Sequence, residues 1–143
     1  MLFKRITRSD AETAFIVVKN TSGSTMTAGY HAFFDVSTAA DGVAVTMCTS
    51  TALNAYAGCI DAAIANGGYG LAQVYGYRAA GLVIASGLVA SGENLMPEDG
   101  KWSLTCTATA TTSGFKAFAF ICETIASATQ STSANKRIFI RAL

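Results

Sequence analysis

The sequence predicts an all-β fold, either a small β-barrel or a β-sandwich, and three observations point to it. Short runs of β-branched and aromatic residues recur along the chain, separated by clusters of glycine, serine, threonine and asparagine. Asn66, Gly67 and Gly68 form a turn signal that leads directly into an apolar run, residues 71–77. Two stretches roughly sixty residues apart resemble each other, which suggests that two similar β-units compose the fold.

Length and composition indicate a compact folded protein. The chain has 143 residues, a length that is usual for one domain, and 51% of them are apolar while only 13% are charged. We expect a basic N-terminal arm over residues 1–12 and a single β-domain over residues 13–143. So few charges on so apolar a chain predict that part of its apolar surface lies in contacts between subunits.

The expected strands follow one another along the chain. Residues 13–19 form a β-branched run, residues 30–36 read as a second strand, and residues 43–48 alternate apolar and small polar side chains. Pro97 to Gly100 is a turn signal. The remaining strands are expected at 71–77, 80–85, 94–96, 102–108, 115–124 and 137–142, with loops at 107–114 and 126–135.

Residues 52–65 admit two interpretations. Leu53, Tyr56, Ile60 and Ile64 are spaced as on one face of a helix. The internal repeat favours an extended segment from about residue 56 to residue 64, because residues 55–61 align with residues 117–123. Residues 26–29 align with residues 89–92 at nearly the same offset. Chance agreement in a sequence rich in alanine, glycine and threonine is the alternative to a true repeat.

Positive charge is concentrated at the two ends of a chain whose net charge is +1. Lys4, Arg5 and Arg8 lie near the start, whereas no lysine or arginine occurs between residues 20 and 77. These ends are either solubilising tails or docking segments for an acidic or phosphate-bearing partner. A second basic group closes the chain and consists of Lys136, Arg137 and Arg141.

Side chains that could carry chemistry are few. His31 is the only histidine and has no nucleophile motif near it, so we expect a structural role and no catalytic residue. Asp61 and Glu123 align in the repeat and could form a carboxylate pair, although acids on outward faces or at turns explain them better. Phosphate-loop and dinucleotide-binding motifs are lacking, so no cofactor is expected.

Metal, nucleic-acid and membrane partners are not expected either. The four cysteines are dispersed, and one histidine cannot complete a zinc site. They are predicted to be reduced, buried thiols; two disulfides are the alternative. The aromatic strands 30–34 and 69–77 contain no basic residue that could contact phosphates. The sequence has no apolar run long enough for a membrane span, and no apolar segment of a signal peptide follows its basic start.

Three segments together resemble a known family. They read N-T-S-G-S-T-M-T-A-G at 20–29, A-Y-A-G-C-I-D-A-A-I-A-N-G-G-Y-G-L-A-Q-V-Y-G-Y at 55–77 and V-A-S-G-E-N-L-M-P at 89–97. The chain resembles small proteins that decorate or cement the heads of tailed bacteriophages. Their pattern aGvA-x-x-x-I-x-x-G-x-x-G-x-v-Q-v-x-G leads into v-x-x-G-d-x-L. The corresponding residues here are Gly58, Ile64, Gly67, Gly70, Gln73, Gly76, Gly92 and Leu95.

The resemblance implies a virion protein without enzyme activity. It implies a β-barrel or β-sandwich body, homotrimers, and binding to the major capsid protein on the exterior of a head assembled in the host cytoplasm. In that setting Lys4, Arg5 and Arg8 become candidate contacts with the capsid or a neighbouring subunit. The alternatives are another virion component, such as a head-completion or tail protein, and a small β-barrel that binds a ligand.

Overall fold

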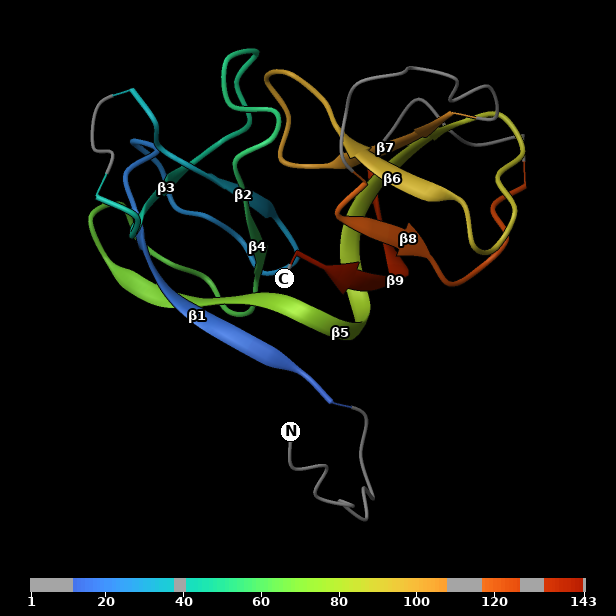
Figure 1. Ribbon diagram of the computed structural model, residues 1–143, viewed down its shortest axis with the longest axis horizontal. Coiled ribbons are helices and arrows are strands. Elements are labelled where there is room, and N and C mark those ends of the chain that lie inside the picture. Colours follow the sequence, from blue (N-terminus) through green and yellow to red (C-terminus); the bar gives the residue numbers. More distant parts are fainter. Residues whose placement is uncertain (1–11, 38–40, 108–116, 127–132, 143) are drawn as a thin grey trace, which may run out of the picture.

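The computed structural model describes residues 12–37, 41–107, 117–126 and 133–142 of the chain (Figure 1). The described residues form strands and connections and contain no helix, so the prediction of an all-β fold is confirmed. The strands are β1 (Ala14–Asn20), β2 (His31–Phe34), β3 (Ala44–Thr46), β4 (Tyr56–Ile60), β5 (Tyr69–Ser86), β6 (Asn94–Pro97), β7 (Leu104–Thr107), β8 (Ala119–Ile121) and β9 (Ala134–Arg141).

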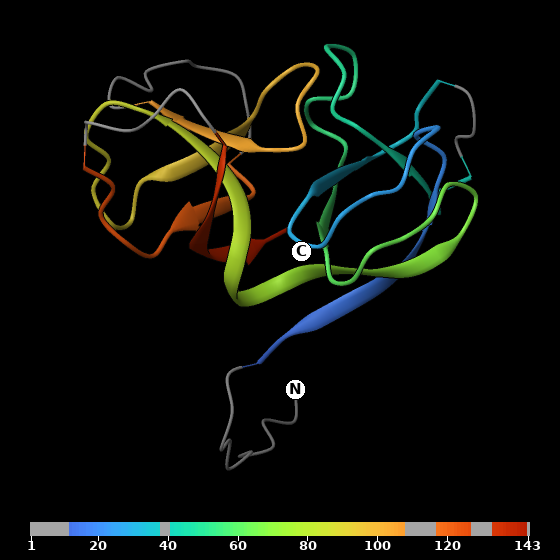
Figure 2. The same ribbon diagram turned by 180° about the vertical axis from the view of Figure 1, so that it is seen from behind.

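The strands form one nine-stranded mixed sheet that closes on itself twice. Its order is β1-β3-β2-β4-β5-β7-β6-β8-β9, with further pairings of β1 with β5 and of β5 with β9. Unit 1 consists of β1 to β4 with the first half of β5, and unit 2 consists of the second half of β5 with β6 to β9. In each unit the first strand pairs in parallel with the third, and every other pairing is antiparallel. The two units therefore repeat one topology around a shared strand, and Figures 1 and 2 show them as two lobes joined by β5.

The backbone hydrogen bonds confirm the internal repeat and correct its register. Gly29 N donates to Ile60 O (2.9 Å), and Gly92 N donates to Ile121 O (2.8 Å). Ile60 thus corresponds to Ile121 in the repeat, whereas the sequence alignment matched it with Cys122. The difference of one residue arises in β4, where Phe33 pairs with Tyr56 but Ala32 pairs with Gly58. The residue between them is a β-bulge that shifts the rest of β4 by one position.

Strand β5 is one continuous strand of 18 residues, not the two strands expected at 71–77 and 80–85. It turns sharply between the units (Figures 1 and 2). The turn coincides with Gly76, whose φ is +103°, and with a register shift against β9 between Arg78 and Gly81. The glycine and the bulge let the chain change direction without ending the strand, whereas the sequence pattern indicates two separate strands at this point.

Each unit has its own hydrophobic core, but the core of unit 2 extends into unit 1. The unit 1 core contains Val18, Met26, Ala32, Val45, Ala57, Ile60, Ile64 and Ala72. The other core joins strands of unit 2 to Phe33, Tyr56 and Cys59 of unit 1. The rings of Tyr56 and Phe118 stack across the contact, with centroids 5.0 Å apart. The contact between the two units is thus part of the core and not a loose linker.

Strand β4 explains why residues 52–65 were ambiguous. All five of its residues are buried, since one face lies on the unit 1 core and the other on the core that joins the units. A strand buried on both faces has no alternation of apolar and polar residues. The extended interpretation is confirmed for Tyr56–Ile60, and Ile64 adds a bridge to Met26; the helical one is wrong. Strand β9 begins at Ala134, inside the expected loop 126–135.

Replacement of Gly76 by alanine should destabilise the fold more than replacement of Gly92. Both glycines have positive φ, +103° and +95°, so each alanine incurs a backbone cost of about 1–3 kcal/mol. A Cβ at Gly76 would also collide with the carbonyl oxygen of Glu12, whereas a Cβ at Gly92 meets nothing within 4 Å. Urea denaturation of the two variants measures the difference. An equal loss of unfolding free energy in the two variants would show that the segment before β1 moves aside at no cost.

Candidate functional site

The predicted contact residues Lys4, Arg5 and Arg8 lie outside the described residues. The second basic group lies on β9. Arg141 donates to Asn94 Oδ1 (2.8 Å) and its guanidinium lies over the ring of Phe120. Arg137 pairs with Glu123 (3.1 Å). Arg137 and Arg141 are therefore partnered side chains on β9.

Asp61 and Glu123 each pair with an arginine and not with each other. Arg78 pairs with Asp61, and Arg137 with Glu123, both at 3.1 Å. Burial raises the pKa of Glu123, but hydrogen bonds from the backbone and side chain of Arg137 outweigh it and leave that pKa below its usual value. Both carboxylates are thus structural ion-pair partners, which agrees with the expectation of acids at outward positions.

Arg78 is the polar side chain that holds the turn of β5, and sequence analysis did not single it out. Its Nη2 donates to the carbonyl oxygens of Ile60 (2.8 Å) and Asp61 (3.3 Å), and its Nε donates to Ala80 O (3.1 Å). Only 12% of the side chain is exposed. Arg78 therefore ties the second half of β5 back to the end of β4.

Gln73 completes the same cluster from the other side of the turn. It is buried, and its Nε2 donates to Tyr75 O (3.1 Å) and Tyr77 O (3.0 Å), while its Oε1 accepts from Arg78 (3.4 Å). A buried amide that reaches two successive carbonyl groups on one side of the strand fixes the backbone at a point where the strand is irregular. This is a physical reason for a glutamine at that position of the sequence motif.

His31 is fully buried between the two units and serves structure. Its Nδ1 hydrogen-bonds with Tyr56 Oη (2.8 Å). Its Nε2 has no well-formed hydrogen bond to any described group, and a Cβ at Gly81 would lie 3.4 Å from it. Burial, followed by the positive charge of Arg78, lowers the pKa of His31 from 6.5 to about 3, against a small opposing effect of the Leu82 backbone. The imidazole is therefore neutral at physiological pH.

The four cysteines are free thiols. Cys48, Cys59 and Cys106 are buried, as expected, whereas Cys122 is partly exposed, which the sequence did not predict. Burial raises the pKa of Cys59 to about 12 and those of Cys48 and Cys106 to about 11. Thiols with such pKa values are poor nucleophiles.

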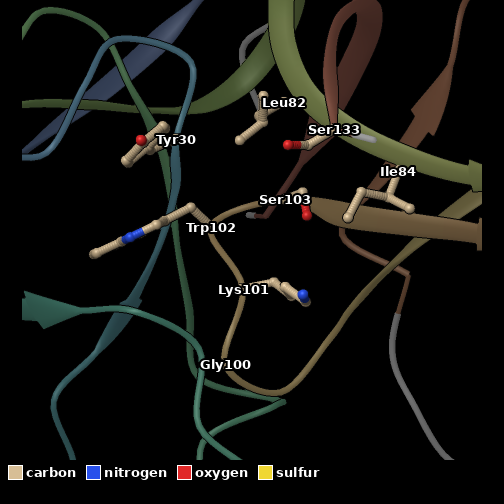
Figure 3. A pocket seen from close by; sticks show the side chains of 8 residues that line it. All are labelled: Tyr30, Leu82, Ile84, Gly100, Lys101, Trp102, Ser103 and Ser133. Atoms are coloured by element: carbon tan, nitrogen blue, oxygen red, sulfur yellow. The ribbon is translucent and has the colours of Figure 1, made fainter. Parts of the chain in front are cut away.

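A pocket of about 320 Å³ opens where the loop before β7 meets unit 1 (Figure 3). The rings of Tyr30 and Trp102 stack at one side of it, with centroids 5.2 Å apart. Among the described residues that line it, only Lys101 and Tyr30 are titratable. The other lining residues are Leu82, Ile84, Gly100, Ser103 and Ser133.

The most prominent exposed feature is an apolar face on the outside of β1 and β5. Phe15 and Val17 of β1 are 42% and 59% exposed, and Tyr69 and Leu71 of β5 are 66% and 45% exposed. In the β1–β5 register Val17 lies opposite Leu71, and Lys19, whose Nζ lies over the ring of Tyr69, lies opposite Tyr69. The four apolar side chains, which we call the β1–β5 apolar face, form a contiguous candidate contact surface.

The described residues contain no group of three or more histidine, cysteine, aspartate or glutamate side chains that could hold a metal ion. None of their elements is a helix of the length and hydropathy that a membrane span requires.

Comparison with known proteins finds a structural relative but no sequence family. No family model matches the sequence, and no curated protein matches it significantly. Among solved structures, the chain is similar to the head fiber gp8.5 N base of bacteriophage phi29. The likeness is one of fold. It has a TM-score of 0.50 at 14% sequence identity and spans 92% of this chain and 96% of the phage chain.

Replacement of Arg78 by methionine should lower the free energy of unfolding by about 2–3 kcal/mol, because a nearly buried cation and its carbonyl and carboxylate acceptors lose one another. Arg137 is the matched control: it pairs with a carboxylate at the same distance but is 55% exposed. Arg137→Met should cost less than about 1 kcal/mol. Equal losses in urea denaturation would contradict a structural role of Arg78 at the turn.

The stability of the protein should depend on His31 below pH 6.5, the usual pKa of the side chain. The folded-state pKa is lower than the unfolded-state value, so the unfolded state binds a proton that the folded state does not, down to about pH 3. Over that window stability falls as pH falls, by about 1.4 kcal/mol per pH unit. In His31→Gln the decrease between about pH 6 and pH 5 should be smaller by roughly that amount, as measured by urea denaturation at each pH. An unchanged pH dependence would show that His31 is not neutral in the folded state.

Proposed function

We propose that this chain is a structural protein of a tailed-phage virion, which binds the outside of the head and stabilises the contacts between capsomers. The observation that carries the proposal is the likeness of fold, over nearly the whole of both chains, to a domain described as the base of a phage head fiber. The segments 20–29, 55–77 and 89–97, which resemble head decoration proteins in sequence, are a second line of support that does not depend on the likeness of fold.

The physical properties of the molecule suit a cement protein. Two units that share β5 and are joined by the core of unit 2 form one packed body, so we expect little conformational entropy to be lost when the body binds. Binding of a partner to the β1–β5 apolar face would remove apolar surface from water, which favours association. Because a shell presents many identical sites, each contact can be modest and still hold neighbouring capsomers together.

The partners follow from this role. The protein binds the major capsid protein and associates with itself as a homotrimer, which would match the local three-fold positions of a shell. It acts without a cofactor and without enzyme activity on the exterior of the virion, and neither nucleic acid nor membrane is its partner. The β-domain over residues 13–143 is the body, and residues 1–12 form the arm.

A second candidate function is the base of a fibre on the head. The solved relative favours it, because that domain is the base of a head fibre. The two candidates share the head-binding surface and differ in whether a further protein segment extends outward. Head-completion and tail proteins remain alternatives with ring-forming stoichiometry.

Deletion of residues 1–8 tests both the function and the arm. The intact protein should bind purified phage heads that lack it, and its binding should weaken as salt shortens the screening length below about 10 Å. The truncated protein should fold with unchanged thermal stability but bind heads more weakly, since Lys4, Arg5 and Arg8 are removed. Cosedimentation with heads measures both. Lack of binding by the intact protein would overturn the head-binding function, whereas unchanged binding by the truncated protein would overturn only the role of the arm.

A further inference from the structure

Most of strand β1 has one free edge. Over nearly its full length β1 pairs with β5, but on its other side it pairs with β3 only at Lys19 and Asn20. Figures 1 and 2 show β1 running along β5 at the outside of unit 1. Within the described part of the chain, no strand pairs with that side of residues 14–18.

The hydrogen bonds at the end of β1 show which backbone groups face the free edge. Lys19 N donates toward the β3 side, to Val43 O (2.9 Å), whereas Asn20 N donates to Gly68 O (2.9 Å) beside β5. Because the backbone groups of successive residues in a strand point to opposite sides, Phe15 and Val17 share the direction of Lys19. Their N–H and C=O groups therefore point out of the sheet at the free edge.

The side chains of this edge lack the usual protection against strand pairing. Natural edge strands carry charged residues, proline or a bulge that blocks addition of another strand. The free part of β1 reads A-F-I-V-V, five apolar residues without charge or proline, and the irregularity in its pairing with β5 lies at its start, between Ala14 and Phe15. Its outward side chains, Phe15 and Val17, belong to the β1–β5 apolar face. Such an edge favours an extended polypeptide as its partner.

We propose that the partner is a second copy of this chain, bound through antiparallel pairing of β1 with β1 about a two-fold axis at Ile16. In that register Phe15 lies opposite Val17 of the second copy, and the reverse. Both residues direct their backbone groups to the edge, so the two residue pairs together form about four hydrogen bonds and leave no group at the centre unpaired. The pairing ends where Lys19 is already bound to β3.

The register also extends the apolar surface. On the outward face, Leu71 and Val17 of one copy lie side by side, and Phe15 of the other copy is the next residue in this row. Val17 and Phe15 then cover part of each other's exposed surface. An interface between identical edges is isologous, so it can act beside a three-fold contact that uses different surfaces and could join one trimer to the next. The proposal goes beyond head binding and can be tested without phage heads.

A cysteine at position 16 tests the pairing directly. In the proposed register Ile16, whose side chain packs against the unit 1 core, lies opposite Ile16 of the second copy in a pair without mutual hydrogen bonds. The Cα atoms of such a pair are about 4.5 Å apart, a separation that a disulfide can span. Ile16→Cys should therefore form a disulfide-linked dimer under mild oxidation. Ala14→Cys is the matched control on the same strand and face, because the two copies of position 14 would lie about 14 Å apart. The unsubstituted protein measures the background from the four natural thiols.

Blocking the edge should abolish the dimer. Val17→Pro removes an N–H that points to the free edge and breaks no bond to β5, and proline is tolerated at such edge positions. Combined with Ile16→Cys it should eliminate the cross-link while thermal unfolding remains cooperative. If this variant does not fold, Val17→Lys serves instead, since it keeps the N–H but places a charge in the apolar row. Equal cross-linking of the Ala14→Cys and Ile16→Cys variants, or cross-linking that survives the substitutions of Val17, would overturn the proposal.

Discussion

The turn of β5 is the constraint on which the rest of the structure depends. The first half of β5 pairs with strands of unit 1 and its second half with strands of unit 2. The strand must therefore change direction between the units without losing its backbone hydrogen bonds. Gln73 donates to the carbonyl oxygens of Tyr75 and Tyr77, on either side of Gly76, and Arg78 donates to those of Ile60 and Asp61 at the end of β4. Two closed units with a shared strand leave fewer open sheet edges than two separate sheets would.

The sharing of β5 accounts for the sharing of the core. Because the units are held close at the turn, β4 is buried on both faces and Tyr56 reaches Phe118 in the other unit. His31 is enclosed in the same region, where only its neutral form is compatible with burial. The two units therefore form one packed body, and the buried side chains of Gln73 and His31 hydrogen-bond within it.

The outside of the molecule is asymmetric although the topology repeats. In unit 1 the outer strands β1 and β5 carry the apolar face and a free strand edge. The corresponding edge of unit 2 is closed more fully, since β5 pairs with β7 over four residues, Val83 to Ser86. A repeat that keeps its internal contacts and changes its surface can thus provide a binding side without disturbing the fold.

The sequence alone determined the all-β class, the repeat, most of the strands and the structural role of His31, because alternation, turn glycines and a lone histidine are local signals. It did not determine the register within β4, the continuity of β5, the partners of Arg78 or the free edge of β1. Each of these depends on which backbone groups meet across long separations in sequence. A bulge of one residue in β4 shifts the rest of that strand by one position, and the β2–β4 pairing and the hydrogen bonds donated by Gly29 N and Gly92 N reveal it. Local pattern specifies that a strand forms, whereas its partner, and the edge it leaves open, are decided by tertiary pairing.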